Sequence, residues 1–305
     1  MPKLTIFIQC YNRPVYAKLA IESVLRQTNR AFRLIISDNS TNDELFRLVQ
    51  TQFPGVEYRR RQPSLPALDH FNQSISEADT EFFCLFHDDD LMEPEYVDAM
   101  LNTIELHPLA VAYACNAVTI DEDVVRKGSF FESGGKHVIV ENPRALAGRY
   151  VSRYPNGFAP FPAYIYRSSV VKEIPLDQQS GGKYSDVTWL LEISKRGPIV
   201  WNSRKLIRYR MHAANDSNLE SLRDRLKLLG FLKRNKLVVG RGVINDCRFG
   251  IYKNLRNRSL MSHGAYSRHR NFIDRYLLRY RFKRFAKPET YAYLLYKFGK
   301  IFGYQ

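Results

Sequence analysis

The sequence predicts an α/β fold with a mostly parallel central sheet, followed by a basic helical region towards the C-terminal end. Roughly the first 115 residues alternate short β-rich runs with amphipathic segments of helical length, which is typical of βαβ units. From Arg204 onward the chain carries 25 Lys and Arg against 6 Asp and Glu, and the part before it has 21 against 25. A mildly acidic body is therefore followed by a strongly basic region.

The elements of the body follow from apolar periodicity and from start and stop signals. Strands are expected at Leu4–Gln9, Phe32–Ser37, Val56–Arg60, Glu81–Phe86, Val111–Ala117 and Ala163–Arg167. Helices are expected at Pro14–Gln27, from about Ser40 to Gln52, and at Ala67–Ala78, Glu95–His107 and Pro143–Tyr150. Ser40 with Asp43, and Thr41 with Glu44, have the spacing of a capping box, which predicts the start of the second helix.

Two stretches interrupt this pattern. Asp121–Gly135 is polar and Gln178–Asp186 is glycine-rich, so both are expected to be flexible loops. The second loop leads into a helix that runs from Asp186 to about Lys195, and two short strands are expected at 198–202 and 206–210. The predicted domains are a body of residues 1–218 and a basic, aromatic-rich helical region of residues 219–305.

Composition indicates a soluble globular protein, with 45% hydrophobic and 25% charged residues and no disordered bias. A cytoplasmic location is expected from the N-terminal stretch and from the cysteines. The N-terminal stretch lacks the features of a signal peptide, and no apolar run approaches the roughly 20 residues that cross a bilayer. The four cysteines are widely spaced and lack metal-type spacing, so they are expected to be reduced core thiols.

Polar groups follow three of the predicted strands. They are Cys10-Tyr11-Asn12, Asp38-Asn39-Ser40 and His87-Asp88-Asp89-Asp90. Ligands of open α/β sheets bind outside the carboxyl ends of the strands, so these three groups should face one crevice. The sequence has neither a Gly-x-Gly-x-x-Gly fingerprint nor a P-loop, so a phosphate bound here needs a metal ion.

Five motifs resemble the pattern of glycosyltransferase family 2. They are "IFIQCYNRP", "IISDNSTND", "LFHDDDLMEP", "YSDVTWLLEISKRG" and "YRMHAANDS", in this order over about the first 215 residues. The resemblance implies a GT-A type, Rossmann-like sandwich that binds a nucleotide sugar. It also implies transfer of the sugar, with inversion, from a nucleotide-diphosphate donor, UDP-linked donors being favoured, to a saccharide or lipid-linked saccharide hydroxyl.

Three adjacent carboxylates directly after a buried strand repel one another and favour a bound cation. Hard cations such as Mn²⁺ or Mg²⁺ prefer oxygen ligands and neutralise a diphosphate leaving group. The alternative is an acidic helix N-terminus, which one or two carboxylates stabilise. The resemblance implies that Asp88 approaches the ribose or the metal shell, that Asp89 or Asp90 ligates the metal, and that His212 closes the site. His87 stands where the family more often has its first aspartate, and it is expected beside the ligands rather than among them.

The resemblance also implies a nucleotide site. Asp38 would accept a hydrogen bond from the base, and Tyr11 and Asn12 would line the same pocket. The alternative for Asp38-Asn39-Ser40 is a turn and N-cap. Asn72 matches a family asparagine, although Phe71 stands beside it where an arginine is common. Arg210, together with Asn215 and Ser217, would contact the diphosphate.

Asp186 is the predicted catalytic residue. Inverting transfer needs a general base for the acceptor hydroxyl, and the family places its base carboxylate in the motif that contains Asp186. The alternative is a structural role for Asp186 in the first turn of its helix, with Ser185 as another candidate cap.

Residues 219–305 mix Arg and Lys with Tyr, Phe and Leu. A basic amphipathic helix with aromatic residues favours the surface of an anionic membrane, which would fit a lipid-linked acceptor at the inner face of a bacterial cell membrane. Packing of the apolar side on the body is the second interpretation, and nucleic-acid binding is a weaker third.

We therefore expect a metal-dependent inverting glycosyltransferase of bacterial surface polysaccharide biosynthesis. Two alternatives remain open: a metal-dependent nucleotidyl or phosphoryl transferase that uses the same carboxylates, and a non-catalytic protein whose basic region binds membrane or nucleic acid.

Overall fold

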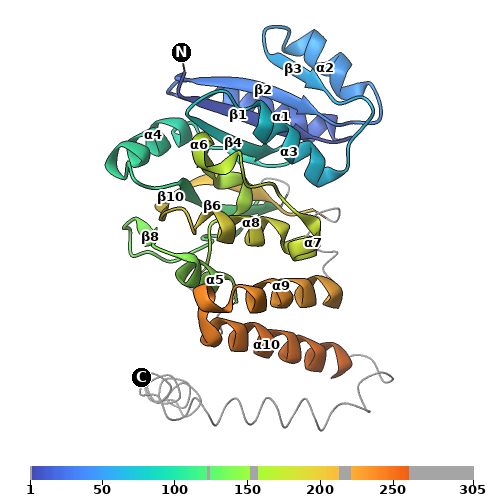
Figure 1. The fold of residues 1–305 in the computed structure, drawn as a ribbon. Coiled ribbons are helices and arrows are strands. Elements are labelled where there is room, and N and C mark those ends of the chain that lie inside the picture. The colour runs from blue at the N-terminus through green and yellow to red at the C-terminus, as the bar shows by residue number, and fades with distance from the viewer. Residues whose placement is uncertain (1, 122–123, 152–156, 213–220, 261–305) are drawn as a thin grey trace. The chain divides into compact units, whose positions relative to one another are not determined.

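The computed structural model describes residues 2–121, 124–151, 157–212 and 221–260 (Figure 1). The chain divides into two compact units, Met1–Val243 and Ile244–Gln305. The predicted boundary at residue 218 remains a prediction, although the first part of the basic region, up to Val243, belongs to the first unit. The basic amphipathic helix was predicted within the stretch from Arg270 onward, which lies outside the described residues, as do Asn215 and Ser217.

A single sheet forms the centre of the first unit, with the strand order β3-β2-β1-β4-β9-β6-β10-β5. In chain order its strands are β1 (Leu4–Cys10), β2 (Phe32–Asp38), β3 (Glu57–Arg60), β4 (Phe82–His87), β5 (Leu91–Met92), β6 (Ala112–Asp121), β7 (Val124–Lys127), β8 (Val138–Val140), β9 (Ile165–Arg167) and β10 (Ile199–Arg210). The neighbours β3, β2, β1 and β4 are parallel, as are β6 and β10, whereas the short β5, β7, β8 and β9 pair antiparallel. The mostly parallel sheet predicted from the sequence is confirmed.

The helices connect and cover these strands. They are α1 (Pro14–Leu25), α2 (Glu44–Gln52), α3 (Ala67–Glu77), α4 (Tyr96–Leu106), α5 (Pro143–Val151), α6 (Ser168–Val171), α7 (Gln178–Gly181), α8 (Ser185–Ile193), α9 (Leu222–Arg234) and α10 (Lys236–Leu260), with 3-10 turns η1 (Phe161–Ala163) and η2 (Gly182–Tyr184). Gly240 has a positive φ of 80° and divides α10 at a kink.

Helices lie on both faces of the sheet. Alternate residues of β1, among them Ile6 and Ile8, pack into one buried cluster with the apolar sides of α1 and α4. Gln9, which points to the opposite face, accepts a hydrogen bond from Ser74 of α3 at 3.3 Å. This arrangement is the predicted sandwich.

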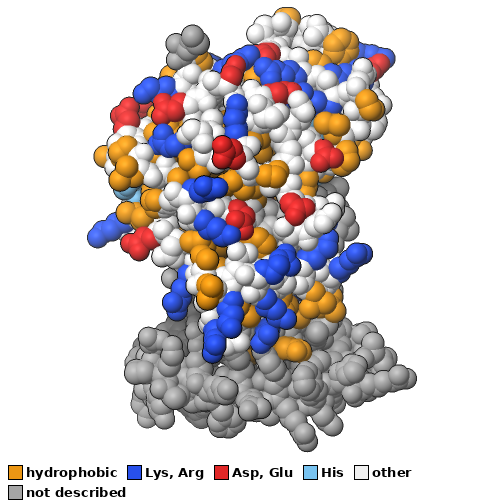
Figure 2. Space-filling model, viewed as in Figure 1, with side chains coloured by type: hydrophobic (Ala, Val, Ile, Leu, Met, Phe, Trp, Pro, Cys, Tyr) orange, Lys and Arg blue, Asp and Glu red, His pale blue; other side chains and the backbone are white. Residues whose placement is uncertain are grey.

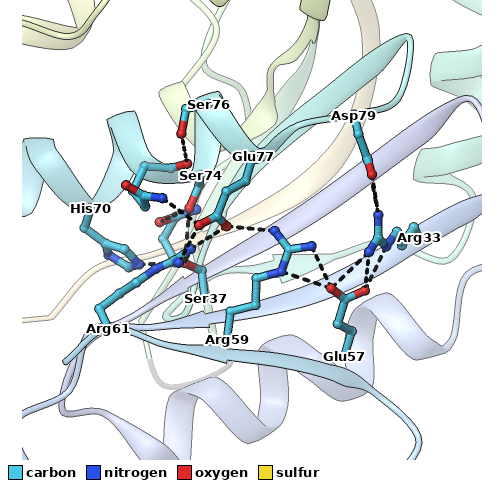
Figure 3. Close-up of polar contacts among 12 residues, drawn as sticks. Arg33, Ser37, Glu57, Arg59, Arg61, His70, Ser74, Ser76, Glu77 and Asp79 are labelled. Atoms are coloured by element: carbon cyan, nitrogen blue, oxygen red, sulfur yellow. Dashed lines mark hydrogen bonds and ion pairs between the residues drawn. The ribbon is translucent and has the colours of Figure 1, made fainter.

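A network of arginine and carboxylate side chains fixes the β3 edge of the sheet to α3 (Figure 3). Arg61 and Arg59 lie 2.6 and 2.8 Å from the Glu77 carboxylate of α3. Arg33 of β2 bridges Glu57 and Asp79 at 2.8 and 2.9 Å. The network thus joins the side chains of β2 and β3 to those of α3 and of Asp79, which follows it.

Four local predictions are wrong. The predicted capping box does not form, because the Ser40 hydroxyl accepts from the Asn12 backbone and Thr41 bonds the Asn12 side chain; α2 starts only at Glu44. The stretch from Asp121 contains the strand β7, and Gln178–Tyr184 forms α7 and η2 instead of a flexible loop. The two short strands at 198–210 are one strand, β10, because it continues through irregular pairing at 202–207.

The four cysteines are free and buried, as predicted. In the described part of the chain, no helix is long and apolar enough to cross a membrane.

α9 brings basic side chains to the surface of the first unit, where Figure 2 shows a gathering of Lys and Arg. Its basic residues are Arg223, Arg225, Lys227, Lys233 and Arg234. Its apolar side is buried, and Lys227 donates to the carbonyl of Gln178 at 3.1 Å. For α9 itself, the structure therefore shows a helix that packs on the body.

Candidate active site

Strand register brings the predicted polar groups to one edge of the sheet. Cys10 at the end of β1 lies beside Asp38 of β2, and Gln9 lies beside His87 of β4. Because these strands are parallel, the residues that follow them emerge together, as expected at the carboxyl ends of an open α/β sheet.

The antiparallel pairing of β5 with β10 brings the C-terminal end of β10 to the same edge of the sheet. Leu91 pairs with Arg208 and Met92 with Ile207, so β10 ends next to the aspartates. Tyr16 of α1 contacts the end of this strand and the residues that follow it. Its ring stacks on His212, with ring centroids 5.5 Å apart, and the Arg210 guanidinium lies 5.1 Å from its centroid.

Asp88 and Asp89 share one arginine. The Tyr11 backbone N–H donates to Asp88 Oδ2 at 2.9 Å, and Arg13 Nη2 lies 2.9 Å from Asp88 Oδ1. Arg13 Nη1 donates to Asp89 Oδ2, which also lies 2.9 Å from His212 Nε2. The structure thus brings Tyr11, His212 and both carboxylates together.

Asp90 is held on one side only. Its Oδ1 accepts from the Arg210 backbone N–H at 2.8 Å, and Arg210 Nε donates to the Asp89 carbonyl at 3.1 Å. Asp90 is 1% exposed and its Oδ2 has no hydrogen-bond partner, although His87 Nδ1 lies 3.7 Å away. A buried carboxylate oxygen without a donor is costly, and this oxygen is suited to bind a cation.

Burial and charge change the acidity of all three groups. Burial raises the pKa of Asp88 to about 7, although Arg13 and the Tyr11 N–H lower it. Burial and the neighbouring Asp89 raise the pKa of Asp90 above its usual range. Burial also disfavours ionised Asp89, but His87, Arg13 and His212 hold its pKa below the usual value. Three carboxylates with so few cations around them favour a bound positive ion.

His87, Asp89 and Asp90 form a group that can hold such an ion, because one ligand atom from each lies within 4.8 Å of the others. The group fits a divalent metal in ligand type and burial. His87, which the sequence placed beside the ligands, belongs to this group, whereas His212 reaches it through Asp89.

Asp38 is fully buried at the end of β2. Its Oδ1 accepts from the Ser40 N–H at 2.8 Å and its Oδ2 from the Tyr58 hydroxyl. A nucleotide base must therefore use a remaining lone pair of this carboxylate, and the base contact stays a prediction.

Tyr11 and Asn12 lie between Asp38 and the aspartate run. Tyr11 is 48% exposed, so its ring is accessible. Asn12 has a left-handed φ of 52°, and Thr41 N–H donates to its Oδ1 at 2.9 Å. Both residues lie beside the aspartate run, and their contact with a nucleotide stays a prediction.

Asn72 bonds a segment that lies far away in the sequence. Its amide donates to the Leu176 carbonyl and accepts from the Leu176 N–H, at 3.0 and 2.9 Å. This clamp ties α3 to the segment before α7. Asn72 therefore has a clear structural task, and its role towards a nucleotide stays a prediction.

Asp186 lies in the first turn of α8, where no side chain forms an N-cap bond. Burial of its carboxyl raises its pKa to about 6, against backbone hydrogen bonds that lower it. Trp189, one turn later, packs on Phe161 with ring centroids 6.1 Å apart, and Phe161 packs on His87 at 5.7 Å. Aromatic packing thus joins the helix of Asp186 to the candidate metal group.

Sequence reasoning missed Arg13, Tyr16 and Tyr58 as parts of this site. Arg13 stands inside the motif "IFIQCYNRP", directly after Asn12, which was the available signal. Tyr16 and Tyr58 carried no signal, because tyrosines on a helix and a strand are more often core residues.

The fold is that of a glycosyltransferase of GT-A type, and comparisons with known proteins agree. The family model described as "Glycosyl transferase family 2" matches residues 5–174. The chain therefore belongs to glycosyltransferase family 2, and the matched part is the transferase domain of this family.

Two curated relatives match over shorter stretches. An uncharacterized glycosyltransferase of Rickettsia felis is 26% identical over 133 residues, and Protein CgeD of Bacillus subtilis is 25% identical over 119 residues. These alignments cover 43% and 36% of this chain, but only 21% and 28% of the two relatives.

Solved structures show the same fold. S. aureus TarS 1–349 matches with a TM-score of 0.56 at 14% identity, over 77% of this chain and 72% of TarS 1–349. The crystal structure of TarS 1–349 in complex with UDP-GlcNAc matches with a TM-score of 0.55 at 14% identity, over 82% and 81%.

Proposed function

We propose that this protein transfers a sugar from a nucleotide-diphosphate donor, with inversion and with the help of a divalent metal, to a hydroxyl of a saccharide or lipid-linked saccharide. The observation that carries the proposal is the buried, unpartnered Oδ2 of Asp90 beside Asp89 and His87, at the carboxyl ends of parallel strands. The family supports sugar transfer as the reaction.

Mn²⁺ or Mg²⁺ fits the group best. Asp89 and Asp90 supply hard oxygen ligands, and His87 or His212 adds a nitrogen that favours Mn²⁺ over Mg²⁺. The metal, when bound, neutralises the charge that develops on the diphosphate leaving group. Arg210 donates its backbone N–H to the Asp90 carboxylate and its side-chain Nε–H to the Asp89 carbonyl. It thereby positions the turn that carries both carboxylates.

A UDP-linked donor is favoured. The crystal structures of TarS 1–349 in complex with UDP and with UDP-GlcNAc share this fold. In this chain the exposed Tyr11 ring and Asn12 offer the wall of a base pocket next to the aspartates.

Asp186 is the proposed general base. A base works best when its pKa lies near the pH of the reaction, and burial places the pKa of Asp186 at about 6. The carboxylate would take the proton of the acceptor hydroxyl as this oxygen attacks the anomeric carbon, whose bond to the diphosphate breaks.

Replacement of Asp186 tests this role. Asp186→Asn should lower the turnover of sugar transfer by about 10³-fold, because a general base contributes about 10²–10⁴-fold, while donor affinity stays within about twofold. In the unchanged protein, kcat/KM should rise with pH through about 6 and then level off, because only the ionised carboxylate accepts a proton. Unchanged turnover of the variant contradicts the assignment.

A thermal-shift panel tests the donor and the metal. The melting temperature should rise with a UDP-sugar and Mn²⁺ together and much less with either alone. Replacement of both Asp89 and Asp90 by Ala should remove the Mn²⁺-dependent part. A shift that is equally large without metal contradicts metal dependence.

We propose that the acceptor is an intermediate of bacterial surface polysaccharide biosynthesis. The basic, aromatic composition after residue 219 would suit a peripheral location at the inner face of the membrane, near lipid-linked saccharides. Sedimentation with vesicles of phosphatidylglycerol and phosphatidylcholine, against phosphatidylcholine alone, tests this location.

A further inference from the structure

Arg13 occupies an unusual place for an arginine in a cation-binding site. It lies directly before α1 and contacts two carboxylates of the aspartate cluster, which consists of Asp88, Asp89 and Asp90, as well as His212. Its Nη2 meets Asp88 at 2.9 Å, and its Nη1 meets Asp89 and lies 3.3 Å from His212 Nε2. Among the described residues, Arg13 is therefore the only Lys or Arg whose side chain forms ion pairs with these carboxylates.

A metal and Arg13 must compete for Asp89. The group that can hold the metal is His87, Asp89 and Asp90, and Asp89 also makes the shorter of the two ion pairs of Arg13. Two cations that share one carboxylate repel each other within a few ångströms, and low local polarity increases the repulsion. Each should thus weaken the other, and the coupling is reciprocal.

The Arg13 side chain is placed so that it can move away from the aspartates. Its side chain is 34% exposed, whereas Asp88 and Asp90 are buried. Its contact with Asp88 Oδ1 is an ion pair without an aligned hydrogen bond. The backbone is anchored separately, because the Arg13 carbonyl accepts from the Ala17 N–H at 2.9 Å. The side chain can therefore swing while α1 stays in place.

We propose that Arg13 is an exchangeable cation, which holds the aspartates together before the metal arrives and binds the diphosphate of the donor afterwards. The inference rests on the proposed metal-dependent use of a nucleotide diphosphate. A guanidinium that leaves Asp89 needs a new anion, and the diphosphate arrives on the same metal. Arginine suits this second task, because its planar fork binds phosphate oxygens through two hydrogen bonds.

If Arg13 had a fixed structural role instead, its loss would have the opposite effect on metal binding. If Arg13 only keeps the carboxylates in position, its loss should disorder the ligands and weaken the metal. If it is an exchangeable cation, its loss should strengthen binding of the free metal and weaken binding of the diphosphate. The two affinities should then move in opposite directions.

The experiment compares the unchanged protein with Arg13→Gln. Binding of Mn²⁺ without nucleotide is measured by electron paramagnetic resonance, and binding of UDP at saturating Mn²⁺ by calorimetry. Arg13→Gln should bind Mn²⁺ about tenfold more tightly, because a competing charge is gone, and UDP about tenfold more weakly, because a charge-assisted contact is gone. Arg33→Gln is the matched control, since Arg33 also bridges two carboxylates, and both affinities should stay as in the unchanged protein.

The measured affinities either support or overturn the exchange of Arg13. Equal or weaker Mn²⁺ binding by Arg13→Gln overturns the inference, and so does unchanged UDP binding. If the unchanged protein binds no Mn²⁺ even with UDP, the proposed metal dependence itself fails, which is a separate result. Should Arg13→Gln not fold, Arg13→Lys keeps the charge without the fork. It should keep Mn²⁺ affinity within about threefold and lose UDP affinity, and an unchanged UDP affinity overturns the inference.

Discussion

Two clusters of arginine and carboxylate side chains lie on the same sheet and differ in charge balance. The network at the β3 edge contains three arginines, Arg33, Arg59 and Arg61, and three carboxylates, Glu57, Glu77 and Asp79 (Figure 3). The aspartate cluster contains three carboxylates, and in the described part of the chain Arg13 is the only Lys or Arg whose side chain forms ion pairs with them, through Asp88 and Asp89. The first is balanced, and the second has an excess of negative charge.

The balance sets the acidity of each cluster. Burial alone would raise the pKa of Glu77, but hydrogen bonds from Arg61, Gln73 and Arg59 lower it to about 2. Burial raises the pKa of Asp88 to about 7 in spite of Arg13. The same residue types thus build a structural brace in one place and an incomplete site in the other. Carboxylates that the protein itself leaves unbalanced are candidates for function.

The largest expected effect is on activity. Replacement of Asp89 and Asp90 together by Asn should lower sugar transfer by about 10³-fold or more, because the charge that holds the metal is removed. Glu77→Gln should leave transfer within about twofold. The rate of UDP release with a UDP-sugar donor and Mn²⁺ measures both. Equal losses in the two proteins would contradict a functional difference between the clusters.

The second effect is on stability. Glu77→Gln should lower the free energy of unfolding by about 2 kcal/mol, because Arg61, whose side chain is only 10% exposed, loses its charged partner. Asp79→Asn is the matched control, with a side chain that is 62% exposed, and should cost less than about 0.5 kcal/mol. Urea unfolding monitored by circular dichroism measures both changes.

The dependence on pH sharpens this second test. The pKa of Glu77 is about 2 in the folded protein and lies below its ordinary value of 4.5, so folding favours the ionised form. Its stabilising contribution is present above about pH 4.5 and is lost as the pH falls towards 2. Glu77→Gln should therefore show a shallower loss of stability in acid, and an unchanged slope would contradict the role of Glu77.

Much of this contrast could be read from the sequence, because the ends of strands are local signals. The run Asp88-Asp89-Asp90 follows a continuous apolar strand, and parallel pairing then dictates its neighbours. The partners of these carboxylates were not readable in the same way. Arg13 lies 76 positions before Asp89, and the two meet because Arg13 follows β1, Asp89 follows β4, and these two strands pair in parallel.

The errors in the fold have similar causes. The polar run around Ser203 resembles a break between two strands, yet β10 continues through irregular pairing that its neighbour β6 supports. The hydroxyls of Ser40 and Thr41 looked like helix caps, but the Ser40 hydroxyl accepts from the Asn12 backbone N–H and the Thr41 hydroxyl accepts from the Asn12 side-chain amide. In both cases a tertiary contact outweighs a correct local propensity.

The smallest expected effect has the opposite sign from that of Glu77. In protein without metal at pH 8, Asp90→Asn should raise the free energy of unfolding by about 1 kcal/mol, because it removes one buried charge from an unbalanced cluster. The Asn side chain can keep the hydrogen bond from the Arg210 N–H, so the turn should survive. The order should reverse when Mn²⁺ and UDP are added, since the unchanged protein then gains stability from binding and the variant does not. Thermal unfolding with and without the two ligands measures this reversal. A variant that is less stable under both conditions would show that Asp90 is a structural residue, like those of the balanced network.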